Sequence, residues 1–187
     1  ERRVVIVDGF VAGAAALPTG EATALALLFL LSAMGKSAQL PFSGWLPRAM
    51  EGPTPSSALF YGAVSIHAGL FLLLRVWPVF EASPLARVIG VVVGLATAFY
   101  AAAVVRVHTD AKGALAHATL TQVGLILAEI CLGLTTLALF HLVGHALKGG
   151  SAWAGEGNEF SDIPRLAQVF ALSPEQCAAR LVDNGLA

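Results

Sequence analysis

The chain has 187 residues, of which 57% are hydrophobic and 12% are charged, and its mean hydropathy is +0.76. Average soluble domains carry about 25% charged residues, and a soluble domain of this length cannot bury so much apolar side chain. The composition also excludes disorder over the whole chain. The 11 basic and 12 acidic residues provide no basic surface for nucleic acid. These values favour an integral membrane protein.

Five apolar segments are candidates for membrane helices, because a spanning helix needs about 20 mostly apolar residues. In chain order they are residues 22–45, 56–74, 88–105, 114–132 and the shorter 134–147. Polar or proline-containing breaks separate them, and their length favours helices over barrel strands, in which polarity alternates at every second residue. We therefore predict an all-α, polytopic transmembrane helix bundle with about five spans.

The two ends of the chain differ in composition from this membrane core, which we place at residues 21–150. Residues 1–20 are Gly-rich and too short for a span, so they are expected to form an interfacial or loop segment. Residues 151–187 carry five acidic and two basic side chains, which predicts a polar, acidic tail that is solvated or disordered. Because no initiator Met and no signal peptide are present, we expect an internal fragment of a longer protein.

Lys36 lies near the middle of the first apolar segment, where a charged ammonium costs about 2.5–3.5 kcal/mol. Pro41 follows five residues later; its ring collides with the carbonyl of Ser37 and it donates no backbone hydrogen bond. The sequence therefore predicts a helix broken near Lys36, inside protein or beside a water-filled cavity. A titratable amine at such a break suits a proton relay. The alternative is that the helix ends there and Lys36 extends to the membrane interface.

Two histidines in the last apolar segment form the second candidate. His141 and His145 are four residues apart and therefore share one helix face. No Glu stands between them, which excludes a zinc-protease motif. Their imidazoles suit a proton path, and the alternative is a pair of neutral, hydrogen-bonded core histidines. Lys148 follows on nearly the same face and is a further relay candidate.

Polar residues inside the other apolar segments complete the set. Glu129 lies deep in the fourth segment and must be uncharged or paired if it is buried, so it joins the relay candidates. His67 lies in the middle of the second segment, where a relay role and a helix–helix hydrogen bond are equally open. His117 and Gln122 are candidates for interhelical hydrogen bonds.

Several motifs resemble those of a known family. They are residues 35–41 (GKSAQLP), 45–59 (WLPRAMEGPTPSSAL), 109–112 (TDAK), 121–124 (TQVG) and 140–146 (FHLVGHA). Over about residues 20–148 the chain resembles the antiporter-like proton-pumping subunits of respiratory complex I, especially the distal subunit L. The related Mrp sodium/proton antiporters and membrane-bound hydrogenases share these motifs.

The resemblance assigns roles by position. Lys36 matches the central lysine of the family's first broken helix, and His141 and His145 match the paired histidines on a later helix. Lys148 corresponds to the central connecting lysine, although it follows His145 one residue too early. Tyr61 stands where many members have a channel histidine, and His67 lies on another face.

The resemblance also implies a membrane location and partners. It implies a proton-translocating subunit that works with other membrane subunits of a complex I-like or Mrp-like assembly and moves protons or sodium ions. We expect it in a lipid bilayer, the cytoplasmic membrane of a prokaryote. The sequence contains no specific motif for NADH, flavin, iron–sulfur or quinone, so redox chemistry is expected on partner subunits, and no cofactor, metal or nucleic acid is expected here.

Two departures from the family and several alternatives remain open. The family's channel glutamate would precede residue 1, and its second broken helix would follow His145, so we do not expect the chain alone to move protons across a membrane. The alternatives are an Mrp-type cation/proton antiporter subunit and a membrane partner in a bicarbonate-uptake complex. Two further alternatives belong to other functional classes. One is a b-type haem protein with His67, His141 or His145 as axial ligands, and the other is an inert membrane scaffold.

Overall fold

The computed structural model describes residues 18–49, 65–107 and 111–154, together with Gly9 and Gly13. The elements over these ranges are helical: α2 (Thr19–Lys36), the 3-10 helix η1 (Phe42–Gly44), α3 (Trp45–Ala49), α5 (Ala68–Arg75), α6 (Trp77–Glu81), α7 (Pro84–Val105), α8 (Ala111–Leu132) and α9 (Thr135–Ala154). The predicted all-α class is therefore confirmed for the described part of the chain. Within it, two helices are long and apolar enough to cross a membrane, Pro84–Val105 and Gly113–Leu132, and Thr135–Leu147 is a shorter apolar stretch.

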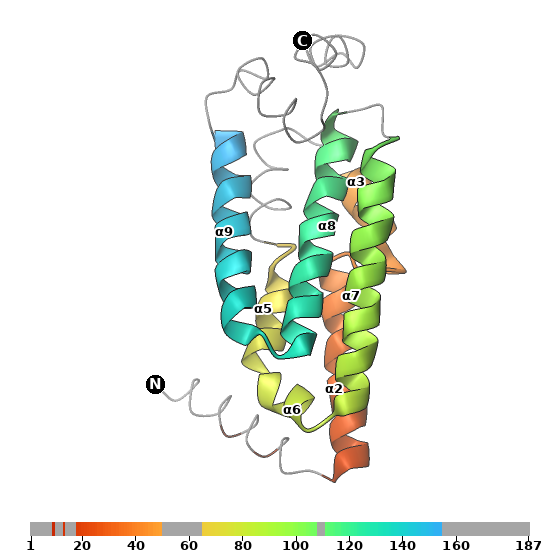
Figure 1. Ribbon diagram of the computed structural model, residues 1–187, viewed down its shortest axis with the longest axis vertical. Coiled ribbons are helices and arrows are strands. Elements are labelled where there is room, and N and C mark those ends of the chain that lie inside the picture. The colour runs from red at the N-terminus through yellow and green to blue at the C-terminus, as the bar shows by residue number, and fades with distance from the viewer. Residues whose placement is uncertain (1–8, 10–12, 14–17, 50–64, 108–110, 155–187) are drawn as a thin grey trace.

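The long helices lie roughly parallel to the long axis of the molecule and form a bundle (Figure 1). Helix α7 packs along α8, α9 and α5 pack against other parts of α8, and α2 packs against α5, α6 and α7. The outer surface is apolar as well, since Phe71, Phe99 and Phe140 are 57%, 74% and 72% exposed. Large apolar side chains at such exposure suit contact with lipid.

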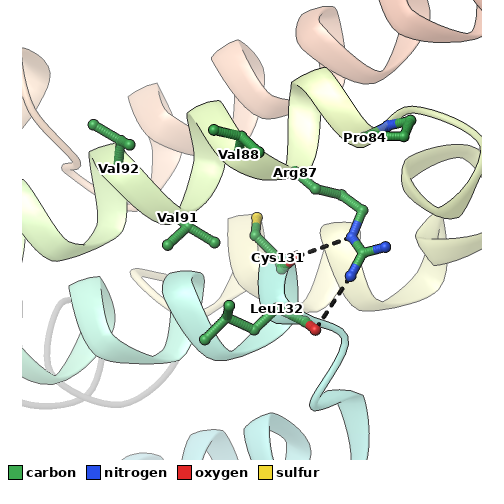
Figure 2. Close-up of a pocket in the computed structure, with 7 residues that line it drawn as sticks. All are labelled: Pro84, Arg87, Val88, Val91, Val92, Cys131 and Leu132. Atoms are coloured by element: carbon green, nitrogen blue, oxygen red, sulfur yellow. Dashed lines mark hydrogen bonds between the residues drawn. The ribbon is translucent and has the colours of Figure 1, made fainter.

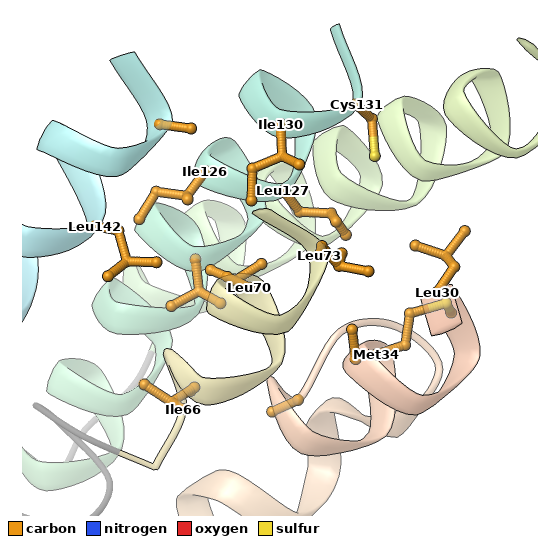
Figure 3. Packing of buried hydrophobic residues seen from close by; sticks show 14 of the residues in the cluster. Leu30, Met34, Ile66, Leu70, Leu73, Ile126, Leu127, Ile130, Cys131 and Leu142 are labelled. Carbon is orange, nitrogen blue, oxygen red and sulfur yellow. The ribbon is translucent and has the colours of Figure 1, made fainter. Parts of the chain in front are cut away.

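The centre of the bundle is filled by aliphatic side chains from four helices and the turn before α5 (Figure 3). The buried residues labelled there are Leu30, Met34, Ile66, Leu70, Leu73, Ile126, Leu127, Ile130, Cys131 and Leu142. They come from α2, α5, α8 and α9, so the elements that carry the candidate site residues share one core. Close packing of this kind fixes the relative positions of the polar side chains among them.

The backbone leaves α-helical geometry directly after Lys36, the last residue of α2. Ala38 has a positive φ of 50°, and the peptide bond between Leu40 and Pro41 is cis. Helical structure then resumes at η1 and α3. A polar stretch with irregular backbone thus follows Lys36, at the place where the sequence predicts an interruption.

Neighbouring elements satisfy polar groups of this irregular stretch. The Ser37 hydroxyl donates a hydrogen bond to the carbonyl of Ile66 at 2.6 Å. The Leu40 amide donates to Thr97 Oγ1 on α7 at 3.0 Å. Because buried backbone groups away from water must find partners, these bonds stabilise the break against the rest of the bundle.

Several helix ends differ from the sequence prediction, among them the start of α7 and the end of α9. Helix α7 begins at Pro84 instead of residue 88, because the Ser83 side chain caps it by accepting a hydrogen bond from the Ala86 amide at 3.3 Å and proline is favoured in the first turn. Helix α9 does not end at the glycines after Lys148 but continues to Ala154. A glycine costs a helix only about 1 kcal/mol, which does not by itself end the helix. The next proline, a stronger helix breaker, is Pro164.

The corner between α8 and α9 is closed by a side chain from α7 (Figure 2). The Arg87 guanidinium donates hydrogen bonds to the carbonyls of Cys131 at 3.1 Å and Leu132 at 3.2 Å, and lies 5.2 Å from the centre of the Trp77 ring. Gly133 follows with φ of +92°, a conformation that favours glycine. A cation and a left-handed glycine therefore cap the C-terminus of α8.

Candidate functional site

His141 on α9 makes polar contacts through both of its ring nitrogens. Its Nδ1 lies 2.9 Å and 3.1 Å from the two carboxylate oxygens of Glu129, and its Nε2 lies 3.0 Å from the side-chain oxygen of Gln122. Gln122 and Glu129 are seven residues apart on α8, which places them on one face, two turns from each other. The side chains of His141 and Glu129 are partly buried, 26% and 21% exposed. The contacts show that α9 places the imidazole between two side chains of α8.

A second contact lies one turn further along α9. His145 Nδ1 is 3.0 Å from Nε2 of His67, and the ring centroids are 5.1 Å apart. His67 directly precedes α5 and is 3% exposed. At this distance one nitrogen must carry the hydrogen and the other must accept it, so the two imidazoles share a proton position.

The turn that carries His67 is also in contact with the end of α2. Ser37, next to Lys36, is hydrogen-bonded to the carbonyl of Ile66, which precedes His67. Gly69 packs so closely on α2 that a β-carbon there would lie 2.7 Å from the carbonyl oxygen of Ala33. The irregular backbone after Lys36 is thus held directly against the turn that carries His67, one member of the histidine pair.

We call His67, His145, His141, Glu129 and Gln122 the polar row. Of the relay candidates predicted from the sequence, Glu129, His141, His145 and, as one of its two alternatives, His67 belong to it, together with Gln122, a predicted interhelical hydrogen-bond residue. Lys36 does not: its side chain is exposed and makes no hydrogen bond or ion pair among the described residues. Pro41 lies in the irregular stretch after α2, and the side chain of Lys148 and all of Tyr61 fall outside the described residues.

Sequence reasoning did not find the partners in this row. His67 and Gln122 were each visible as polar residues inside apolar segments, but nothing in the sequence paired His67 with His145 or Gln122 with His141. The helices are apolar nearly all round, so their period does not show which faces meet. His117 shares the histidine signal but bonds to the Gly113 carbonyl on its own helix at 2.8 Å.

The row can hold and exchange protons. Imidazole changes its protonation near neutral pH, and a carboxylate beside it can balance the charge. Titratable groups within apolar membrane segments are rare and mark ion or proton pathways. Over the described residues, no group of three or more His, Cys, Asp or Glu side chains is placed to hold a metal ion.

Apolar helices that enclose such a row and expose apolar residues define a membrane helix bundle. Comparison of sequences gives the family. Residues 8–169 match the profile described as "NADH:quinone oxidoreductase/Mrp antiporter, TM", and the chain belongs to this family of membrane subunits.

Several relatives are similar to the chain. It is 44% identical over 137 residues to NADH-quinone oxidoreductase subunit L of Rhodobacter capsulatus, covering 73% of this chain and 19% of the relative. It is 38% identical over 164 residues to the chloroplastic NAD(P)H-quinone oxidoreductase subunit 5 of Lolium perenne, covering 88% and 22%. It is 43% identical over 129 residues to NADH-ubiquinone oxidoreductase chain 5 of Metridium senile, covering 69% and 22%. The chain thus matches 19–22% of the length of these curated relatives.

Proposed function

We propose that the chain is part of a proton-translocating membrane subunit of an NADH-quinone oxidoreductase-type complex, and that the polar row is its part of the proton path. The observation that carries the proposal is the pair of contacts made by one face of α9: His145 with His67, and His141 with Glu129. These two contacts bring three imidazoles and a carboxylate onto one side of α9, within a bundle whose described core is mainly apolar. Membership of the family supports the assignment.

The proposed path starts at the irregular backbone after α2. In this proposal α2, η1 and α3 are the pieces of one broken membrane helix, and Lys36 at its break exchanges protons with the row. The contact between Ser37 and the carbonyl beside His67 gives this step its structural support. The proton then passes from His67 to His145 and along one helix turn to His141. About five spans, the number expected from the apolar segments, belong to the same proposal.

The proposed setting is a membrane complex. Relatives are named as subunits of NADH- and NAD(P)H-quinone oxidoreductases, which supports other membrane subunits as partners. We propose that these partners carry the redox chemistry. The cytoplasmic membrane of a prokaryote is proposed from the bacterial relative at 44% identity. A chloroplast relative at 38% identity makes an organellar membrane the alternative.

Two alternative functions would use the polar row differently: one is sodium/proton exchange, and the other is haem binding. The family description includes Mrp antiporters, so exchange of sodium for protons is the second candidate. A b-type haem would need axial imidazole nitrogens, but His141 uses both ring nitrogens on Gln122 and Glu129. His67 and His145 point a nitrogen at each other at 3.0 Å, which is too short for an iron between them. These contacts leave no room for a haem iron between the facing nitrogens of His67 and His145, and they occupy both ring nitrogens of His141.

Proton uptake by membrane vesicles that contain the assembled complex tests the proposal. We expect His145→Ala to reduce NADH-driven proton uptake at least tenfold, since loss of a positioned proton carrier costs about two orders of magnitude or more. His117→Asn changes a buried histidine outside the row and should leave uptake within twofold of the parent. Equal uptake in both variants would refute the row as the path. Uptake that requires sodium ions would favour the antiporter.

A further inference from the structure

We infer that the groove between α7 and the end of α8 binds an anionic phospholipid, with the lipid phosphate at Arg87 and one acyl chain along the valines of α7. This binding site is independent of the proposed proton path and requires only that the bundle lies in a membrane. It gives Arg87 a ligand in addition to the two carbonyls that its guanidinium caps.

The groove is an open hollow of about 380 Å³ on the outer surface of the bundle (Figure 2). Val88, Val91 and Val92 line it from α7, and Cys131 and Leu132 line it from α8. Among the described residues that line the groove, only Arg87 is charged. Ligand sites in proteins have volumes of about 300–1,000 Å³, with mostly apolar walls and a few polar groups. The groove therefore suits part of a long apolar molecule that carries one charged group.

The apolar walls of the groove face outward. Val88 and Val92 are each 61% exposed, and Leu132 is 56% exposed. Val88 and Val92 are four residues apart, so they lie one above the other on the same face of α7. These valines form a strip that follows the helix axis, which is the shape that an extended acyl chain can pack against.

Arg87 provides a positive charge that the described residues do not balance. Its Nε and Nη2 donate to the carbonyls of Cys131 and Leu132, which carry no net charge. A guanidinium has five N–H donors, and Nη1 makes no hydrogen bond or ion pair within the part of the chain that the structure describes. A phosphate group fits the remaining donors, because guanidinium binds phosphate oxygens through charge-assisted hydrogen bonds.

The position of Arg87 along α7 matches the depth of a lipid headgroup. Arg87 directly precedes the apolar run at residues 88–105, and its guanidinium lies 5.2 Å from the centre of the Trp77 ring. Tryptophan rings are enriched at the boundary between membrane and water, at the level of the headgroups. The valines follow Arg87 toward the middle of α7, which is the direction that an acyl chain takes from its headgroup.

The combination of a cation and an apolar strip selects the ligand. A water-soluble anion would use the guanidinium but not the valines, and an apolar protein helix would use the valines but leave the guanidinium without a counter-charge. An anionic phospholipid uses both, since its phosphate and its acyl chain are parts of one molecule. Charge complementarity thus identifies the occupant of the groove as a lipid with a negative headgroup.

Photo-labelling of the assembled complex in a membrane tests this site. The probe is phosphatidylglycerol with a diazirine in one acyl chain, and phosphatidylcholine with the same chain is the comparison. We expect phosphatidylglycerol to label residues 88–92 of the parent protein about fivefold more strongly than phosphatidylcholine, because one basic side chain near the surface favours an anionic lipid by about 1 kcal/mol. Mass spectrometry of the peptides locates the label.

Two kinds of variant separate the apolar strip from the charge. Val92→Trp fills the groove from an exposed position and should reduce labelling by phosphatidylglycerol several-fold, whereas Leu137→Trp, at an exposed position on α9, should leave it unchanged. Arg87→Gln should bring the labelling by the two lipids close to equality. Arg87→Lys keeps the charge and loses the fork that holds two carbonyls, so it should retain most of the preference for phosphatidylglycerol.

Equal labelling by the two lipids in the parent protein, or labelling that Val92→Trp leaves unchanged, would overturn the inference and indicate ordinary lipid around the bundle. Absence of label from residues 88–92 would also overturn it and would indicate that another protein segment covers the groove. Because labelling does not require proton uptake, a failure of the polar row as the proton path would leave this result unaffected. Likewise, an unlabelled groove would not contradict the proposed function.

Discussion

Gly94 on α7 and Gly124 on α8 bring the backbones of the two longest apolar helices into direct contact. A β-carbon at Gly94 would lie 2.7 Å from the carbonyl oxygen of Gly124, and one at Gly124 would lie equally close to the carbonyl of Gly94. Close approach at small residues is the usual basis of helix packing in membranes, where lipid is as apolar as the helix surface. The contact fixes how α8 presents Gln122 and Glu129 to α9.

The substitution Gly94→Ala should therefore force α7 and α8 apart. The new methyl group would meet backbone atoms of Gly124 and Ala128 at 2.7–2.8 Å, and backbone cannot move aside as a flexible side chain can. Overpacking of this kind costs about 1–3 kcal/mol, measured as a lower midpoint of thermal unfolding in detergent. Gly144→Ala is the matched control, because a β-carbon there meets nothing within 4 Å. If both variants unfold at the same temperature, the close contact does not stabilise the bundle.

The Arg87→Gln substitution should loosen the corner between α8 and α9. It removes a charged donor to the carbonyls of Cys131 and Leu132, and hydrogen bonds from charged groups contribute about 1.5–3 kcal/mol. We discount this to about 1 kcal/mol, since the guanidinium is partly exposed. Hydrogen exchange of the Leu134 amide, which bonds to the Glu129 carbonyl, should accelerate several-fold. Arg106→Gln, at the other end of α7, should leave that amide unchanged; acceleration in both variants would contradict a local cap.

The approximate bounds of α7 and α8 could be predicted because polar and charged residues flank their apolar runs. Arg87 and Arg106 flank the apolar run of α7, and the observed start is only one turn earlier, at Pro84. The end of α2 at Lys36 agrees with the local sequence, since a lysine and a proline within six residues are incompatible with a continuous apolar helix. The positions at which these helices begin and end are thus determined by the local sequence.

The pairing of side chains between helices could not be predicted in this way. Helix α8 carries Gln122 and Glu129 on one face, but its other faces are equally apolar, so its sequence does not show which face meets α9. The neighbours of His67 depend on where the turn before α5 lies relative to α9, and this position is set by core contacts such as those of Leu70 and Leu142. Packing, and not periodicity, therefore determines the polar row.

The bond between Thr97 and the irregular backbone gives a further prediction. Thr97 is fully buried, accepts the hydrogen bond of the Leu40 amide at 3.0 Å and donates to the Val93 carbonyl at 2.8 Å. Thr97→Val keeps the shape but leaves a buried amide without its acceptor, at a cost of about 1–3 kcal/mol. We expect a lower unfolding midpoint and faster exchange of the Leu40 amide. Thr136→Val, on an exposed side of α9, should have neither effect, and protection of the Leu40 amide in Thr97→Val would contradict the assignment.

The relation between Lys36 and His67 can be tested by combining substitutions. The two residues are linked in the structure through Ser37 and the carbonyl of Ile66, although the side chain of Lys36 is itself exposed. If both carry protons along one path, each single variant, Lys36→Ala or His67→Phe, should reduce NADH-driven proton uptake strongly. The double variant should then lose little more than the worse single variant, because steps of one path act as a unit.

Independent contributions would give a different result. If Lys36 acted elsewhere, its loss and that of His67 would multiply, and the double variant would show the product of the two reductions. Separate measurement of NADH oxidation is needed, since a variant that fails to assemble loses both activities. His67→Phe is the variant to check first, because it also removes one hydrogen-bond partner of His145. A double variant at the product of the two reductions, with assembly intact, would place Lys36 outside the path through the polar row.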